Sequence, residues 1–137
     1  MALRLLSRIP MRDHRGFTLI EVLVIIVIIG VLSGIAISQY ASFKAKGYES
    51  KVAAAVRGVA TGQEAYFAEH RIYATDVDDL PGMVVGDVNI VISPGNSGSI
   101  TSSFQIVGTH PKAFHSVTWM SDPLPGSPNL YAAATND

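Results

Sequence analysis

Glu21 is the residue whose type and position have the clearest chemical consequence, because it is the only charged side chain in the apolar run of residues 17–37. A run of this length matches the ~20 residues that cross a bilayer core. A carboxylate costs up to ~2.5–3.5 kcal/mol at the centre of a membrane helix and less near its end. A plain membrane anchor has no use for such a residue, so Glu21 indicates a further function; the alternative is an incidental carboxylate at the interface.

Elsewhere the sequence lacks the constellations that carry catalysis or metal binding. The chain has no cysteine, which excludes disulfides, thiolate ligands and thiol nucleophiles. Its four histidines do not stand at a metal-ligand spacing, and His110 and His115 flank a predicted turn, where we expect exposed loop positions. There is no G-x-S-x-G elbow and no phosphate-binding glycine loop. We therefore expect no enzyme, no cofactor and no metal.

One acidic loop invites a comparison with calcium sites. Asp76, Asp78 and Asp79 stand close together, and oxygen-rich loops suit Ca²⁺. This loop has neither the glycine turn nor the distal glutamate of such a site. The pattern favours a solvated acidic loop or a helix N-cap cluster.

The charges divide at residue 16. The first sixteen residues hold four arginines against one aspartate, and the rest of the chain holds six basic and ten acidic side chains. A mildly acidic product gives no general electrostatic reason to bind nucleic acid. Basic residues before an apolar span predict that the N-terminus stays in the cytoplasm and that the later part faces outward. The leader arginines are Arg4, Arg8, Arg12 and Arg15.

One long helix is the element expected to position Glu21. Proline is absent between Pro10 and Pro81, and a stripe at three- and four-residue spacing marks residues 39–72 as amphipathic. The expected helix is therefore apolar all round over residues 17–38 and has one buried face afterwards. The stripe consists of Val52, Val56, Val59, Gln63 and either Tyr66 or Phe67.

After this helix the pattern predicts a small antiparallel sheet of three or four strands in residues 73–121, hence an α+β fold. Residues 83–93 are rich in valine and isoleucine and predict a strand or a bent strand pair. Two more strands are predicted at residues 102–109 and 116–120, and turn residues separate the three segments. Three prolines fall in residues 122–137, which we interpret as an irregular tail.

Around Glu21 the residues resemble a known family. Arg15-Gly16 followed by Phe17-Thr18-Leu19-Ile20-Glu21 resembles the prepilin peptidase site of type IV pilins and type II secretion pseudopilins, and the likeness continues through Tyr40. The resemblance implies that residues 1–16 are a leader removed after Gly16. It also implies that Phe17 becomes the N-methylated terminus. Glu21 would then meet the cationic N-terminus of a neighbouring subunit.

Three further positions concern helix packing in that family. Gly30 and Gly34 have the small-xxx-small spacing that allows membrane helices to approach closely, with helix flexibility as the alternative. At Ser38 many relatives have proline, which breaks the helical hydrogen-bond ladder. Serine at this position makes the kink of such relatives less expected here.

The resemblance implies a structural subunit of a type IV pilus. Its partners would be sister subunits in a homo-oligomeric filament, membrane lipid before assembly, the prepilin peptidase and methyltransferase, and an inner-membrane assembly platform with its ATPase. We expect a single-pass inner-membrane protein that later enters an extracellular or periplasmic filament. The alternatives are a type II secretion pseudopilin, a simple membrane-anchored periplasmic domain, and a DNA-uptake minor pilin, for which no basic stripe is present.

Overall fold

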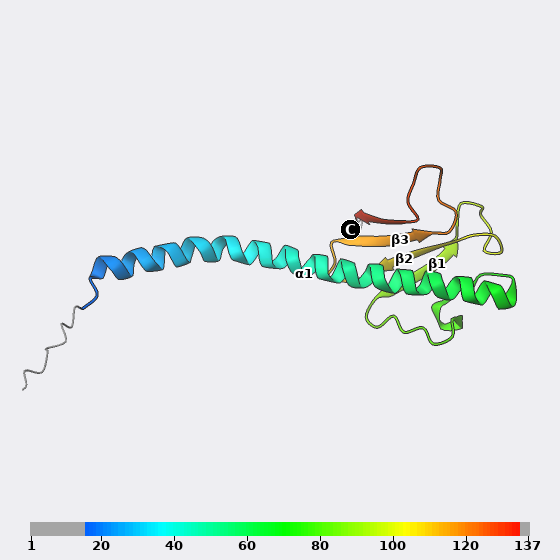
Figure 1. Cartoon of the computed structure of the whole chain (residues 1–137), viewed down its shortest axis with the longest axis horizontal. Helices are drawn as coiled ribbons and strands as arrows, with labels where there is room; N and C mark the ends of the chain where they lie inside the picture. The colour runs from blue at the N-terminus through cyan, green and yellow to red at the C-terminus, as the bar shows by residue number, and fades with distance from the viewer. Residues whose placement is uncertain (1–15, 135–137) are drawn as a thin grey trace, which may run out of the picture. The chain divides into compact units, whose positions relative to one another are not determined.

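The computed structural model describes residues 16–134. Its elements are α1 (Leu19–His70), the short 3₁₀ helix η1 (Val77–Asp79) and four strands, β1 (Asn89–Pro94), β2 (Phe104–Thr109), β3 (His115–Met120) and β4 (Leu130–Ala134) (Figure 1). The chain divides into two units, one ending at Ser38 and one beginning at Gln39. The α+β class and the single N-terminal helix are confirmed.

The first unit contains the apolar part of α1. Every side chain from Gly16 to Ser38 is exposed in the isolated chain. α1 continues through Ser38, whose Oγ donates a hydrogen bond to the carbonyl oxygen of Ile35 at 3.0 Å. Serine retains the backbone N–H that proline would lack, so the helical ladder is not interrupted by residue type at this point.

The second unit is a four-stranded antiparallel meander, with the strands in the order β1-β2-β3-β4. The register aligns one residue from each strand in a row across the sheet: Ile92, Ile106, Trp119 and Leu130. Side chains alternate between the two faces of a strand. This row and the residues two positions away from it along each strand therefore form the apolar face. This face packs against the second half of α1.

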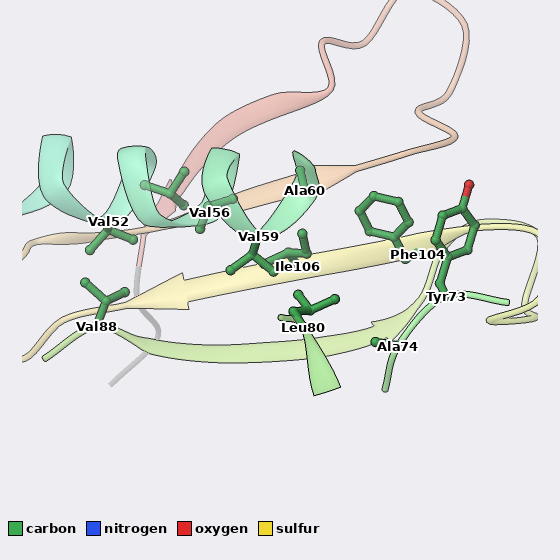
Figure 2. Close-up of a cluster of buried hydrophobic side chains, with 11 residues drawn as sticks. Val52, Val56, Val59, Ala60, Tyr73, Ala74, Leu80, Val88, Phe104 and Ile106 are labelled. Carbon is green, nitrogen blue, oxygen red and sulfur yellow. The ribbon is translucent and has the colours of Figure 1, made fainter. Parts of the chain in front are cut away.

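The core lies between that face and α1 (Figure 2). Val52, Val56 and Val59 are completely buried, as are Phe104 and Ile106 of β2. Burying a side chain of this kind contributes roughly 1.5–3 kcal/mol relative to leaving it exposed. The amphipathic stripe predicted from the sequence is therefore the face of α1 that holds the sheet.

Gly108 of β2 allows α1 to approach the sheet. A Cβ at this position would lie 2.5 Å from Cγ2 of Val56 and 2.8 Å from Cγ1 of Val52. Both distances are shorter than any relaxed carbon contact, so a larger residue would have to displace the helix or distort its valines.

We expect Gly108→Ala to lower the free energy of unfolding by ~1–3 kcal/mol through this overpacking. The matched control is Gly47→Ala, since a Cβ at Gly47 meets nothing within 4 Å. In a helix interior that substitution should raise stability by roughly 0.5–1 kcal/mol. Urea unfolding of the full chain in detergent, followed by Trp119 fluorescence, measures both. Equal effects of the same sign would contradict the close-approach role.

Two boundaries of the sheet differ from the sequence interpretation. The tail expected to be irregular contributes β4, whose Tyr131 pairs with Thr118 and whose Ala132 pairs with Val117 of β3. Its sequence, LYAAA, has little strand propensity, so pairing with β3 and not local preference makes it a strand. At the other side β1 begins at Asn89 and not near residue 83, because a turn containing Gly86 at φ 65° precedes it.

The loops at one end of the sheet are joined by Asp122. Its Oδ1 accepts the backbone N–H of Asn96 at 3.0 Å, and its Oδ2 accepts that of Ser97 at 2.8 Å. Burial tends to raise the pKa of Asp122, but the two N–H bonds and the Ser103 hydroxyl outweigh it and lower the pKa. Glycine is favoured at position 95, since a Cβ there would collide with the Asp122 carboxylate and lie 2.9 Å from the Cβ of Ser103. The carboxylate thus ties the β1–β2 loop to the β3–β4 loop without a disulfide.

Candidate functional site

The residues predicted to be processed precede α1 directly. Gly16 and Phe17 belong to no helix or strand, and the Phe17 side chain is 81% exposed. The remainder of the predicted leader, residues 1–15, lies outside the described part of the chain. An exposed, non-helical bond between Gly16 and Phe17 is sterically open to a protease.

Thr18 and Glu21 form a capping box at the start of α1. The Thr18 backbone N–H and hydroxyl both donate to Glu21 Oε2, at 2.8 Å and 2.7 Å, and the Glu21 N–H donates to the Thr18 hydroxyl at 3.3 Å. This reciprocal arrangement satisfies donors that the first turn of a helix otherwise leaves without partners. It also places the carboxylate where the helix dipole favours negative charge.

The capping box gives Glu21 a role within one chain that our sequence interpretation did not include. The signal was present, because Thr-x-x-Glu before an apolar run is the usual sequence form of this motif. In the isolated chain the carboxylate is therefore hydrogen-bonded although it lies in an apolar segment. These hydrogen bonds lower the free-energy cost of placing the Glu21 charge in an apolar environment, even before a second subunit is present.

The other predicted residues of the apolar segment have open surroundings. A Cβ at Gly30 or at Gly34 would meet nothing within 4 Å. The large side chains between Phe17 and Ile37 are 48–85% exposed. A contiguous apolar surface of this extent requires cover by lipid or by other protein. Its length and composition would allow it to cross a membrane.

The acidic loop after α1 serves a local structural purpose. Asp76 is the N-cap of η1, and its Oδ1 accepts the N–H of Asp78 at 3.1 Å. This is the N-cap arrangement that the sequence pattern favoured over a calcium site. Within residues 16–134 no three or more His, Asp or Glu side chains converge on one point.

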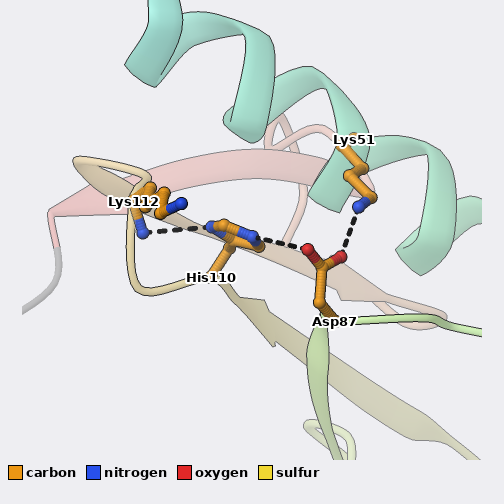
Figure 3. Close-up of polar contacts among 4 residues, drawn as sticks. All are labelled: Lys51, Asp87, His110 and Lys112. Atoms are coloured by element: carbon orange, nitrogen blue, oxygen red, sulfur yellow. Dashed lines mark hydrogen bonds and ion pairs between the residues drawn. The ribbon is translucent and has the colours of Figure 1, made fainter. Parts of the chain in front are cut away.

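A polar cluster in the second unit was not anticipated (Figure 3). The His110 side chain is 4% exposed, so the prediction of an exposed loop histidine is wrong. Its Nδ1 accepts the Lys112 backbone N–H at 3.0 Å, which places the proton of the neutral ring on Nε2, facing Asp87 Oδ2 at 3.2 Å. Asp87 also pairs with Lys51 of α1. The contact with Asp87 comes from a segment distant in the sequence, so it cannot be inferred from the residues of the turn.

These contacts predict an acid-sensitive contribution to stability. Two hydrogen bonds lower the pKa of Asp87 from 3.8 to about 2. The larger effect comes from Lys51 and the smaller from His110. The contribution is thus present above pH 3.8 and is lost as the pH falls toward about 2, where the unfolded chain binds the proton more readily. It should be modest, because Asp87 is 59% exposed and salt screens the pair.

The measurement is the urea midpoint of the full chain in detergent as a function of pH through this range, with Asp87→Asn as the comparison. The variant should show a shallower loss of stability with falling pH than the unmodified chain. Identical pH profiles for the two proteins would contradict the coupling of Asp87 to Lys51 and His110.

The motif and the fold together resemble those of one class of protein. Residues 11–37 match the family model described as the prokaryotic N-terminal methylation motif. The matched segment contains the exposed Gly16–Phe17 bond, the Thr18–Glu21 capping box and most of the apolar part of α1. With one long N-terminal helix packed on an antiparallel sheet, the chain is pilin-like.

Similarity to known proteins falls in the same class. The chain is 33% identical over 67 residues to the type IV major pilin protein PilA of Myxococcus xanthus, covering 49% of this chain and 30% of that protein. It is 25% identical to the type IV major pilin protein PilE1 of Neisseria gonorrhoeae, covering 71% of this chain and 47% of that protein. It is also 28% identical to the type II secretion system core protein G of Vibrio cholerae, covering 58% and 54%. The matched stretches thus span about half or less of these relatives.

Proposed function

We propose that this protein is a structural, non-enzymatic subunit of a type IV pilus filament. The supporting observation is the fully exposed apolar part of α1, which carries one carboxylate within a prepilin-type motif. Lipid covers this surface while the subunit waits in the inner membrane. Sister helices cover it after assembly.

Processing prepares the site for assembly. A prepilin peptidase cuts after Gly16, and methylation of the new terminus at Phe17 leaves a secondary amine that is still cationic. In the filament Glu21 accepts the N-terminus of a neighbouring subunit, and an unpaired charge in the apolar core would be costly. This pairing sets the register between subunits. Gly30 and Gly34 then allow close contact between helices.

A type II secretion pseudopilin is the second candidate. The observation in its favour is the similarity to core protein G, where the match covers more than half of both chains. Both candidates use the same processing and the same apolar helix. They differ in the place where the filament is found, outside the cell or in the periplasm.

Mass spectrometry of the N-terminus, on sheared surface filaments and on membranes separately, tests the proposal. We expect N-methylated Phe17 in the surface filaments. Processed protein found only in membranes would favour the pseudopilin. An intact leader in every fraction would overturn both and leave a simple membrane-anchored domain. Gly16→Glu is the control for cleavage at this bond, because residue 16 lies outside the second unit, Gln39–Asp137, which is called the head below.

A further inference from the structure

The second unit carries an aromatic and basic surface at the end where α1 leaves it toward the apolar segment. Tyr40 is 67% exposed and Phe43 is 80% exposed. Lys44 and Lys46 are exposed beside them, and the Lys44 ammonium lies 5.6 Å from the centre of the Tyr40 ring. Aromatic rings with lysines directly after a membrane span are typical of the interface with the headgroups.

These side chains occupy one side of the helix. At ~100° per residue, Lys46, Phe43, Tyr40 and Lys44 span an arc of ~160°. The centre of this arc is opposite to Ala45, which is 3% exposed and belongs to the buried face. The surface therefore does not contribute to the packing of α1 on the sheet.

The turn between β2 and β3 contributes further lysine and aromatic side chains to this surface, from the side of the sheet. Lys112 and Phe114 of this turn are exposed, Phe114 by 58%. Three contacts place the turn beside the same region of α1. The Lys112 ammonium lies 5.7 Å from the centre of the Tyr48 ring, and the His110 ring stacks on Tyr48 with 4.4 Å between the ring centres. In addition, His115 Nδ1 lies 2.6 Å from Glu49 Oε1. Lysines and aromatic rings thus flank the helix from two directions.

No carboxylate neutralises these lysines in the described part of the chain. The sequence contains no acidic residue between Glu21 and Glu49, and Glu49 is engaged by His115. Asp87 is engaged by Lys51 and His110. Among residues 16–134, Lys44, Lys46 and Lys112 form no ion pair with Asp or Glu, so their charges are available to an external anion.

We propose that this aromatic–lysine collar, made of Tyr40, Phe43, Lys44, Lys46, Lys112 and Phe114, docks on the phosphates of anionic phospholipids at the outward-facing membrane surface. The lysines bind the phosphates and the rings enter the headgroup layer. The collar follows the apolar segment along the same helix, and its charge is complementary to such lipids, which selects a bilayer as the occupant. The inference rests on the membrane-anchored state of the proposed function. It adds that the head is held at the bilayer until the subunit is extracted.

Because the chain has no cysteine, a single introduced thiol can report on docking. Ala113→Cys places a fluorophore in the β2–β3 turn, and Thr101→Cys places it in the β1–β2 loop at the opposite end of the sheet. The full chain is reconstituted in vesicles of phosphatidylcholine, with or without phosphatidylglycerol. Quenching by a lipid with a nitroxide on its headgroup then measures docking.

We expect quenching at position 113, but not at position 101, in vesicles that contain phosphatidylglycerol. One lysine near an anionic surface should be worth about fivefold in the docking equilibrium, so Lys44→Gln with Lys46→Gln should reduce it roughly thirtyfold. The matched control is Arg57→Gln with Arg71→Gln. It removes one cation within α1 and one directly after its end, both ~20 Å or more beyond Lys44, and should change little. Urea unfolding of each variant verifies that the head is folded.

Each other outcome overturns a defined part of the inference. Equal quenching in phosphatidylcholine alone, or in the lysine variant, would show that anionic phosphates are not recognised. No quenching at position 113, with the chain still resistant to alkaline extraction from the vesicles, would overturn the collar and leave the membrane anchor intact. A chain that alkali extracts from the vesicles would overturn the anchored state as well.

Discussion

Replacing Glu21 with glutamine is expected to eliminate surface filaments while the processed subunit stays folded in the membrane. Glutamine retains a side-chain oxygen for the Thr18 donors and is itself accepted at this position of a capping box. It removes only the negative charge. Leaving the N-terminal cation of each neighbouring subunit without a partner in an apolar core should cost ~3–5 kcal/mol per contact. Such a loss, repeated at every subunit, prevents stable growth.

Thr18→Val separates the assembly role of Glu21 from its capping role. The variant removes the hydroxyl that shares the capping box and retains the charge, which should weaken the start of α1 by about 0.5–2 kcal/mol. Filaments should still form. The measurement is the amount of subunit in sheared surface material relative to total processed subunit. Equal filament yields for Glu21→Gln and the unmodified chain would show that the charge of Glu21 is not needed for assembly.

Gln63→Ala is expected to be the most destabilising single substitution on the buried face of α1. The Gln63 side chain is fully buried and pairs twice with the backbone of Ala74: its Nε2 donates to the Ala74 carbonyl oxygen and its Oε1 accepts the Ala74 N–H, both at 2.8 Å. Alanine would leave both backbone groups buried without partners, at ~1–3 kcal/mol each, and would also create a cavity. We expect the free energy of unfolding to fall by ~3–5 kcal/mol.

The matched control for Gln63 is Thr61→Ala, two residues away on the exposed side of the same helix. Thr61 donates to the Arg57 carbonyl oxygen within its own helix, and its removal should change stability by no more than ~0.5 kcal/mol. Urea unfolding in detergent, followed by Trp119 fluorescence, compares the two. Similar midpoints for both variants would show that the double pairing contributes little.

Local pattern was sufficient for the helix and for the motif. The valine stripe repeats at helical spacing, and proline is absent throughout α1, so the element and its buried face could be predicted from neighbours three and four residues apart. The processing and assembly roles of Gly16, Phe17 and Glu21 stay predictions that depend on the motif. The capping box could also be predicted from Thr18 and Glu21, because both residues belong to the same helical turn.

The strand at the C-terminal end shows what local pattern could not provide. Three prolines predict an irregular tail, yet Leu130, Tyr131 and Ala132 pair with β3. Strand pairing depends on a partner edge that is distant in sequence, and a weak strand former adopts it when the edge is available.

By itself, then, the sequence determined the apolar span, the prepilin-type motif, the long helix and the α+β class, because each depends on composition or on residues within a few positions of one another. Only the tertiary structure decided the fourth strand, the need for glycine at position 108, the burial of His110 against Asp87 and the collar that brings Lys112 beside Tyr48. These features join segments far apart in the chain. Their energies come from pairing and packing that exist only when the fold has brought the segments together.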